Sequence, residues 1–308
     1  MNQNIVIGVD VGGSHIICSA IDAKTLQVIP QTTFSSKINN KASKNDVLKN
    51  WAIVINKTIK CLPNIEKISI GFAMPGPFQY KSGIAMFENN DKYENLYNVS
   101  LPNELPKFLE GNNFEFRFLN DATSFGVGVA CMGKAKESEK VIAITLGTGF
   151  GSCFIKNGIP QVKGINVPEG GCLWDKSFKN GIADDFFSTR WFVKRYFELS
   201  GVQVDGVKEI VSLNNEFSTI VFSEFSNNLA KFLSPVINDY KPNVIVLGGN
   251  ISNASDKFMP EVKKLLKKEN LDTDFVVSNL MEEAAIIGSA KLFDTDFWEK
   301  IKNDLPLS

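Results

Sequence analysis

The chain has 308 residues, a net charge of −1, 44% hydrophobic residues and 22% charged residues, which is typical of a globular protein with core enough for two domains. The near-neutral charge excludes a basic field for nucleic acid or an anionic membrane surface, and no apolar run approaches the roughly 20 residues needed to span a bilayer. Five scattered cysteines without a C-x-x-C pair predict reduced thiols in a cytoplasmic protein, and the first residues lack the features of a signal peptide.

The first predicted element is a strand at 5–7 that enters a Gly-Gly-Ser turn and continues into strands at 16–21 and 26–29. β-Branched runs around paired glycines favour strands folded on a tight turn. Glycines let backbone N–H groups converge on an anion. Asp10 beside the turn indicates that the anion carries a divalent cation, which Asp10 would hold directly or through water. An ordinary turn is the alternative that this motif alone leaves open.

The next segments predict an amphipathic helix at 45–61 and a strand at 67–73. A long polar loop follows at 79–98, and such loops inside compact proteins are often functional. Its asparagine and aspartate side chains suit hydrogen bonds to a polyol. A solvated surface loop is the alternative interpretation.

An alternating strand at 114–119 ends at Asn120 and Asp121, and a helix rich in small residues follows at 124–131. A carboxylate at such a junction is often only a helix cap. Ligands of α/β proteins bind at the carboxyl ends of strands, so Asp121 is also a candidate site residue.

A second unit repeats the first pattern. A strand at 141–146 enters a Gly-Thr-Gly turn, and strands follow at 152–155 and 159–162, with an Asn-Gly hairpin signal between them. A repeated strand–turn–strand plan is stronger than either turn alone. Two such phosphate-type turns, one from each half, would clamp a nucleotide between two lobes.

The remaining sequence predicts a loop rich in Gly, Pro and Asn at 164–180 and a helix starting near Asp184 and Asp185. Acidic residues suit a helix N-terminus on dipole grounds alone. A long helix at 216–240 and a buried strand at 243–247 lead to a third glycine turn. The last predicted elements are helices at 260–269 and 282–294 and a strand at 274–277.

Taken together, these motifs resemble the ROK family of repressors and sugar kinases, which belongs to the actin-like ATPase superfamily. The resemblance rests on Asp10-x-Gly12-Gly13-Ser14, Gly71-x-x-x-Pro75-Gly76, Asn120-Asp121-Ala122, Gly147-Thr148-Gly149-x-Gly151 and Gly248-Gly249. It implies an α/β, two-lobed, ribonuclease-H-like fold with a central interdomain cleft, and a homodimer. The expected domains are an N-terminal lobe at 1–118, completed by a C-terminal helix at about 292–308, and a C-terminal lobe at 119–291.

The resemblance implies an ATP- and Mg²⁺-dependent kinase that transfers the γ-phosphoryl group to a hexose hydroxyl, by default the 6-OH of glucose. Asp121 matches the general base, and Asp10 matches the residue near Mg²⁺. The residues matched to the nucleotide are Gly12, Gly13, Ser14, Gly147, Thr148, Gly149, Gly248, Gly249 and Asn250. Those matched to the sugar are Asn120, Glu169, Asp184 (or its neighbour Asp185) and Asn90 (or Asn89).

The chain departs from the family pattern at two points. Cys172 stands where the Glu-x-Gly-His motif has its histidine, and the cysteine-rich zinc loop is missing, so we expect no structural zinc. The only histidine, His15, is expected to be structural. The sugar therefore stays open among glucose, N-acetylhexosamines and other hexoses, and the donor between ATP and polyphosphate.

Three other functions follow from the same resemblance. A sugar sensor without transfer activity is kept open by the altered Glu169–Cys172 motif. A repressor would need a DNA-binding segment ahead of the first turn, where only four residues precede Ile5. An actin-like or chaperone-like ATPase would leave the sugar-side residues without a role.

Overall fold

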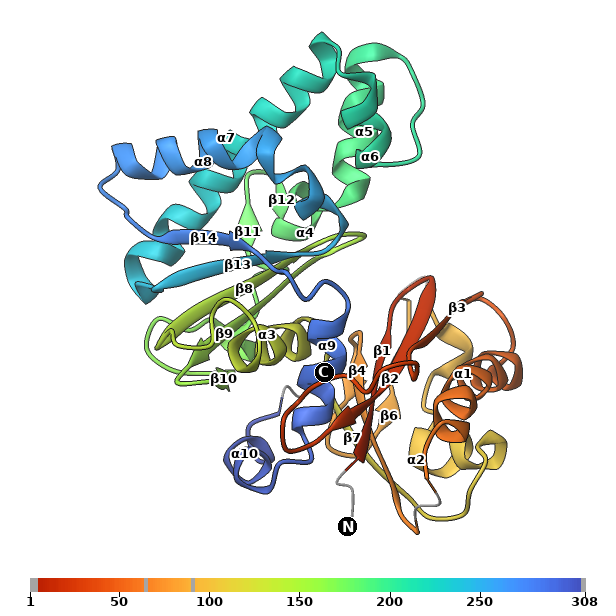
Figure 1. The fold of residues 1–308 in the computed structure, drawn as a ribbon. Helices are drawn as coiled ribbons and strands as arrows, with labels where there is room; N and C mark the ends of the chain where they lie inside the picture. Colours follow the sequence, from red (N-terminus) through yellow and green to blue (C-terminus); the bar gives the residue numbers. More distant parts are fainter. Residues whose placement is uncertain (1–4, 64–65, 90–91, 306–308) are drawn as a thin grey trace. The chain divides into compact units, whose positions relative to one another are not determined.

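The computed structural model describes residues 5–63, 66–89 and 92–305 (Figure 1). The chain forms two compact units. The first unit comprises Met1–Lys136, Gly158–Pro160 and Glu282–Ser308, and the second comprises Glu137–Asn157 and Gln161–Met281.

The elements of the first unit surround a five-stranded sheet. In chain order they are β1 (Ile5–Val11), β2 (His15–Asp22), β3 (Phe34–Lys37), α1 (Lys44–Lys60), β4 (Ile68–Met74), β5 (Phe78–Gln79), β6 (Ile84–Ala85), η1 (Glu94–Leu96), α2 (Leu101–Glu104), η2 (Leu105–Phe108), β7 (Phe114–Asn120), α3 (Asp121–Cys131), α9 (Glu283–Lys291) and α10 (Thr295–Ile301). The strand order is β3-β2-β1-β4-β7. β1 is antiparallel to β2 and parallel to β4, which is parallel to β7.

The second sheet has the order β10-β9-β8-β13-β14. Its strands and the elements of the second unit are β8 (Lys140–Leu146), β9 (Phe150–Lys156), β10 (Ile159–Gln161), η3 (Glu169–Gly171), β11 (Ser177–Phe178), β12 (Gly181–Ile182), α4 (Ala183–Phe186), α5 (Thr189–Ser200), α6 (Val207–Leu213), α7 (Glu216–Tyr240), β13 (Val244–Gly248), η4 (Asn250–Ala254), α8 (Ser255–Lys268) and β14 (Asp274–Val277). As in the first sheet, the strand that enters the glycine turn is antiparallel to the next strand and parallel to a later one.

The two sheets confirm the predicted α/β, ribonuclease-H-like fold and the internal repeat. In each sheet the third strand of the unit lies at one edge, followed by the second, the first, the fourth and the fifth. One predicted strand is wrong. The third strand of the first sheet is β3, whereas the segment at 26–29 makes only an isolated bridge between Val28 and Ile21. The reason is local: the Asp22 carboxylate accepts hydrogen bonds from two backbone N–H groups of the turn, and Leu26 adopts a left-handed conformation that ends regular pairing.

Two glycines let α9 lie directly on the first sheet. Gly8 of β1 and Gly71 of β4 are paired across the two strands. A methyl group at Gly8 would lie 2.3 Å from the carbonyl oxygen of Ile286, and one at Gly71 would lie 2.1 Å from that of Ser289. Alternate residues of a strand face opposite sides, and Figure 1 shows α1 on the other side of this sheet.

Two more glycines bring α3 equally close to α9. A methyl group at Gly128 would lie 1.9 Å from the carbonyl oxygen of Ala284, and one at Gly288 would lie 1.8 Å from that of Ser124. The crossing is therefore backbone against backbone. It groups residues 119–136 and 282–291 with the first unit, whereas the predicted boundaries at 118 and 291 assigned both segments to the C-terminal lobe.

None of the described helices combines the length and apolarity needed to cross a membrane.

We expect Gly128→Ala to lower the free energy of unfolding by at least about 1–3 kcal/mol, the usual cost of overpacking. Alanine is favoured over glycine inside a helix by about 1 kcal/mol, so net destabilisation reports the collision with Ala284. The measurement is urea unfolding. Gly206→Ala is the matched control, because its backbone is extended and a methyl group there would meet only Thr189 at 3.9 Å. Equal stability of both variants would contradict the close crossing.

Candidate active site

The first glycine turn joins β1 to β2 and is held through its carbonyl groups. The Tyr93 hydroxyl donates to Gly12 O at 2.6 Å, the Asn40 amide donates to Gly13 O at 2.5 Å, and Ile38 N donates to Ser14 O at 2.8 Å. Among the described residues, the N–H groups of Gly13 and Ser14 have no hydrogen-bond partner. A turn with its carbonyl groups held and its N–H groups unpaired suits an anion.

Asp10 and Asp121 lie at the same edge of the first sheet. Asp10 is level with Ala73 of β4, which is level with Leu119 of β7, and Asp121 follows two residues later. The structure therefore brings the turn at 12–14 and the predicted general base to the carboxyl ends of parallel strands, where ligands of α/β proteins bind.

Asp121 is fixed through one of its two oxygens. Its Oδ1 accepts hydrogen bonds from Ala122 N at 2.8 Å and from Asn120 Nδ2 at 3.0 Å. Asn120 is the N-cap of α3, since its Oδ1 accepts from Thr123 N at 3.1 Å. No other described residue donates a hydrogen bond to Oδ2 of Asp121. One carboxylate oxygen is therefore left for a ligand, and the capping role that competed for Asp121 belongs to Asn120.

Burial and nearby charges shift the pKa values of both carboxyl groups. Burial, together with the charges of Asp121 and Glu282, raises the pKa of Asp10 to about 8. Burial also raises the pKa of Asp121, and Lys92 and several hydrogen bonds oppose that shift. A raised pKa suits a group that must accept a proton near neutral pH.

The residues around Asp10 fit a Mg²⁺ ion that arrives with an anion. The charges of Asp121 and Glu282 both act on the Asp10 carboxyl group, and a divalent cation would compensate this negative charge. In the described part of the chain, no three Asp, Glu, His or Cys residues cluster closely enough to hold a metal by themselves. Mg²⁺ usually keeps several waters and binds through one or two carboxylates and substrate phosphates, which agrees with both findings.

His15 packs beneath the first turn. A methyl group at Gly12 would lie 3.0 Å from its Cε1, and its Nε2 lies 3.6 Å from Glu282 Oε1. These contacts agree with the structural role expected for His15.

The second glycine turn, between β8 and β9, is held by the start of α5. Thr189 donates from both its backbone N and its hydroxyl to Gly147 O, at 2.8 and 2.9 Å. Arg190 Nη1 donates to Thr148 O at 2.7 Å. Within the described residues, the N–H groups of Thr148 and Gly149 are unpaired, so this turn repeats the design of the first.

The same bonds explain a difference from the sequence prediction. One helix was expected from Asp184 onward, but the structure has two, α4 and α5, separated at Phe187 and Ser188. The break lets the Thr189 backbone face the second turn. This tertiary bond replaces the intrahelical pairing that a continuous helix would have there.

Asp184 lies at the second turn. Its Oδ1 accepts from Phe150 N at 2.6 Å and its Oδ2 accepts from Arg190 Nη2 at 2.5 Å. Asp185 points elsewhere, with its Oδ2 accepting from Ile182 N at 3.0 Å. Both oxygens of Asp184 are thus engaged in bracing the turn, and the sugar contact that the family resemblance implies for it stays a prediction.

The third glycine turn lies beside the second. β13 is the parallel neighbour of β8, with Gly248 level with Thr145. Gly249 has a φ of 80°, and a methyl group there would lie 2.4 Å from Leu146 O. Only glycine fits this position. Asn250 begins η4 immediately afterwards and is exposed.

The other predicted sugar ligands are held by fewer contacts than Asp184. Glu169 is exposed in η3, and the Cys172 thiol donates weakly to its carbonyl oxygen at 3.6 Å. Burial raises the pKa of that thiol, so Cys172 is a neutral group where the family has histidine. Asn89 is exposed with a left-handed backbone. Asn90 lies outside the described residues.

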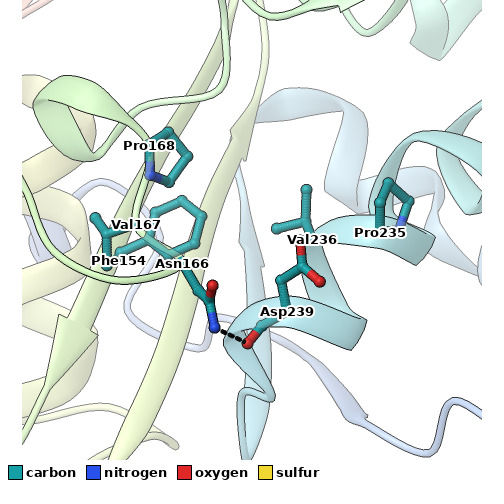
Figure 2. A pocket seen from close by; sticks show the side chains of 7 residues that line it. All are labelled: Phe154, Asn166, Val167, Pro168, Pro235, Val236 and Asp239. Carbon is teal, nitrogen blue, oxygen red and sulfur yellow. Dashed lines mark hydrogen bonds between the residues drawn. The ribbon is translucent and has the colours of Figure 1, made fainter.

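Figure 2 shows a separate pocket of the second unit, about 270 Å³ in volume. Asn166 donates to the carbonyl oxygen of Asp239 at 2.7 Å at its rim. The other lining residues are Phe154, Val167, Pro168, Pro235 and Val236. No glycine turn reaches it, so it lacks the groups that bind phosphate.

A comparison with protein families agrees with this geometry. The description of the ROK family matches residues 6–296, nearly the whole chain. The chain belongs to the ROK family.

Relatives within the ROK family have different functions. A glucokinase of Thermotoga maritima is 23% identical, over 93% of this chain and 96% of its own length. A putative xylose repressor of Caldicellulosiruptor is 21% identical, over 96% of this chain and 79% of its own length. Among solved structures, a ROK family glucokinase from Streptomyces griseus in complex with glucose and AMPPNP is similar, with a TM-score of 0.72 and 18% identity, over 94% of this chain and 99% of that one.

Several residues of the site were not found from the sequence. Asn40 and Tyr93 hold the first turn, and Thr189 and Arg190 hold the second. No motif marks them, since each contacts its turn from at least 27 positions away in the chain. The polar loop predicted at 79–98 was the one available signal, and it contains Tyr93.

The raised pKa of Asp10 makes the stability of the protein depend on pH. The folded protein keeps this proton up to about pH 8, whereas the unfolded chain loses it near its ordinary value of 3.8. The folded state binds more protons in this range, so the free energy of unfolding falls as the pH rises. We expect Asp10→Asn to gain stability relative to the wild type between pH 5 and pH 8, measured by urea unfolding.

Asp22→Asn is the control for this experiment. Hydrogen bonding by the Thr25 backbone lowers the pKa of Asp22. The contribution of Asp22 to the free energy of unfolding therefore changes with pH only below the ordinary pKa of aspartate. We expect the slope of stability against pH between pH 5 and pH 8 to stay as in the wild type. Parallel pH curves for Asp10→Asn and the wild type would contradict the raised pKa.

We expect Asp184→Ala to lower the free energy of unfolding by about 1–3 kcal/mol, because it leaves the N–H of Phe150 without its acceptor. Asp185→Ala is the matched control. It removes a single bond at an exposed position and should cost less than about 1 kcal/mol. Thermal unfolding measures both, and a larger loss for Asp185→Ala would show that Asp185 is the bracing residue.

Proposed function

We propose that this ROK protein is an ATP-dependent sugar kinase that transfers the γ-phosphoryl group to a hexose hydroxyl, with Asp121 as the general base. The observation that carries the proposal is the arrangement at the edge of the first sheet. There the half-buried carboxyl group of Asp121 shares an edge with the first glycine turn, and among the described residues one oxygen of the former and two N–H groups of the latter have no partner.

The chemistry follows from these groups. Asp121 Oδ2 accepts the proton of the sugar hydroxyl as that oxygen forms a bond to the γ-phosphorus, while the bond from this phosphorus to the bridging oxygen breaks and ADP leaves. The amides of the two glycine turns bind the phosphates. Asp10 would hold Mg²⁺ through water, and the ion would neutralise phosphate charge when the nucleotide is bound. Gly248, Gly249 and Asn250 take the nucleoside.

Comparisons favour a kinase over the alternatives. Relatives carry the names glucokinase and N-acetyl-D-glucosamine kinase, and a related structure contains glucose with AMPPNP. Glucose is the default acceptor, held by Asn120 and Glu169, with N-acetylhexosamines and other hexoses as further candidates. We also propose, from the family alone, a homodimer in the cytoplasm with no nucleic-acid partner.

A sugar sensor is the second candidate. It is favoured by Cys172 in the histidine position and by the engagement of Asp184 with Arg190 rather than with an open site. Regulators also occur among the relatives. Such a protein would bind sugar without transferring phosphate.

We expect Asp121→Asn to bind sugar normally and to lose phosphorylation by at least about a hundredfold, since it removes the proton acceptor. A coupled assay of ADP release over a panel of hexoses, with ATP and then polyphosphate, measures the rate and names the substrate. Asp46→Asn, in the first turn of α1, is the control and keeps the wild-type rate. A near-normal rate in Asp121→Asn would remove Asp121 from this role, and a wild type that binds a sugar without ADP release would favour the sensor.

A further inference from the structure

Lys92 lies across the first glycine turn. A methyl group at Gly13 would lie 3.5 Å from both Cδ and Cε of Lys92 and 3.8 Å from its Nζ. The lysine stem therefore lies within van der Waals distance of the position that a side chain at Gly13 would take, next to the turn predicted to bind phosphate.

The same ammonium group also acts on the proposed general base. Lys92 is the cation whose charge favours the ionised form of the Asp121 carboxyl group. Among the described residues, none forms an ion pair or a hydrogen bond with the Lys92 side chain. Its charge thus lies beside the turn proposed to bind the donor and within electrostatic reach of the carboxylate proposed to act on the acceptor, and no described residue neutralises it.

The neighbouring residue fixes this position. Tyr93 is fully buried, and its ring packs edge-on against Trp51 with 5.4 Å between the ring centres. Its hydroxyl donates to Gly12 O and its backbone N donates to Asn40 O, at 2.6 and 2.9 Å. The segment that carries Lys92 is therefore attached to the glycine turn itself, and the lysine keeps its place relative to that turn.

We propose that Lys92 is a catalytic residue whose ammonium group binds the γ-phosphoryl group as it passes from the nucleotide to the sugar hydroxyl. This inference rests on the proposed function. Phosphoryl transfer spreads negative charge over the equatorial oxygens of the moving group, and a cation fixed beside its path stabilises that charge more than the charge of the ground state. Lys92 does not change the rest of the reaction: Asp121 still accepts the proton of the sugar hydroxyl, and ADP still leaves as the new bond to phosphorus forms.

The test compares Lys92→Met with the wild type and with Lys81→Met, an exposed lysine in the turn after β5. Calorimetry measures the binding of Mg²⁺–AMPPNP and Mg²⁺–ADP in the absence of sugar. We expect Lys92→Met to weaken AMPPNP binding about tenfold, the size of one charge-assisted hydrogen bond, and to leave ADP binding within about twofold. Lys81→Met leaves both unchanged, and Lys92→Arg restores part of the AMPPNP affinity.

The rate of ADP release with sugar gives the second readout. We expect Lys92→Met to lower kcat about a hundredfold, comparable to the loss of one donor to a developing charge, with sugar affinity unchanged. An unchanged ratio of AMPPNP to ADP affinity in Lys92→Met would overturn the role of Lys92. The ratio is measured without sugar, so it tests Lys92 independently of the proposed function. The proposed function itself would fail if the wild type released no ADP in response to any sugar.

Discussion

The contact on which the first unit depends is the direct packing of the α9 backbone against β1, β4 and α3. Four glycines, Gly8, Gly71, Gly128 and Gly288, leave no side chain between these backbones. Protein interiors are close-packed and do not deform continuously, so the contact fixes the positions of all four elements. The candidate site residues lie at their ends, with Asp10 on β1, Asp121 at the start of α3 and Glu282 next to α9.

This packing buries Asp10 and brings it within reach of the charges of Asp121 and Glu282, and the fold has to tolerate the cost of ionising it there. The raised pKa of Asp10, caused first by burial and then by these two charges, is the physical sign of that cost. Arrangements that destabilise the free protein in this way are common where a ligand supplies the missing charge. A positive charge beside Asp10 would offset this repulsion, and the Mg²⁺ ion that we propose to arrive with the nucleotide has that sign.

Both units build their glycine turns in the same way. Each glycine turn is held through its carbonyl groups by residues distant in sequence, and each has N–H groups that pair with none of the described residues. The supporting residues differ, with Tyr93 and Asn40 in one unit and Arg190 and Thr189 in the other. The repeated backbone geometry therefore does not depend on repeated side chains, which explains why the repeat is visible in the glycines and strands alone.

The sequence by itself determined the fold class, the strand–turn–strand repeat and the glycine turns, because apolar periodicity and the conformational freedom of glycine are local properties. It also marked Asp10 and Asp121, since both adjoin such motifs. Only the tertiary structure decided that β3 replaces the segment at 26–29, that the helix breaks before Thr189, and that Asp184 braces a turn. Each of these depends on a hydrogen bond or packing contact whose partner is set by the fold and not by neighbours in the chain.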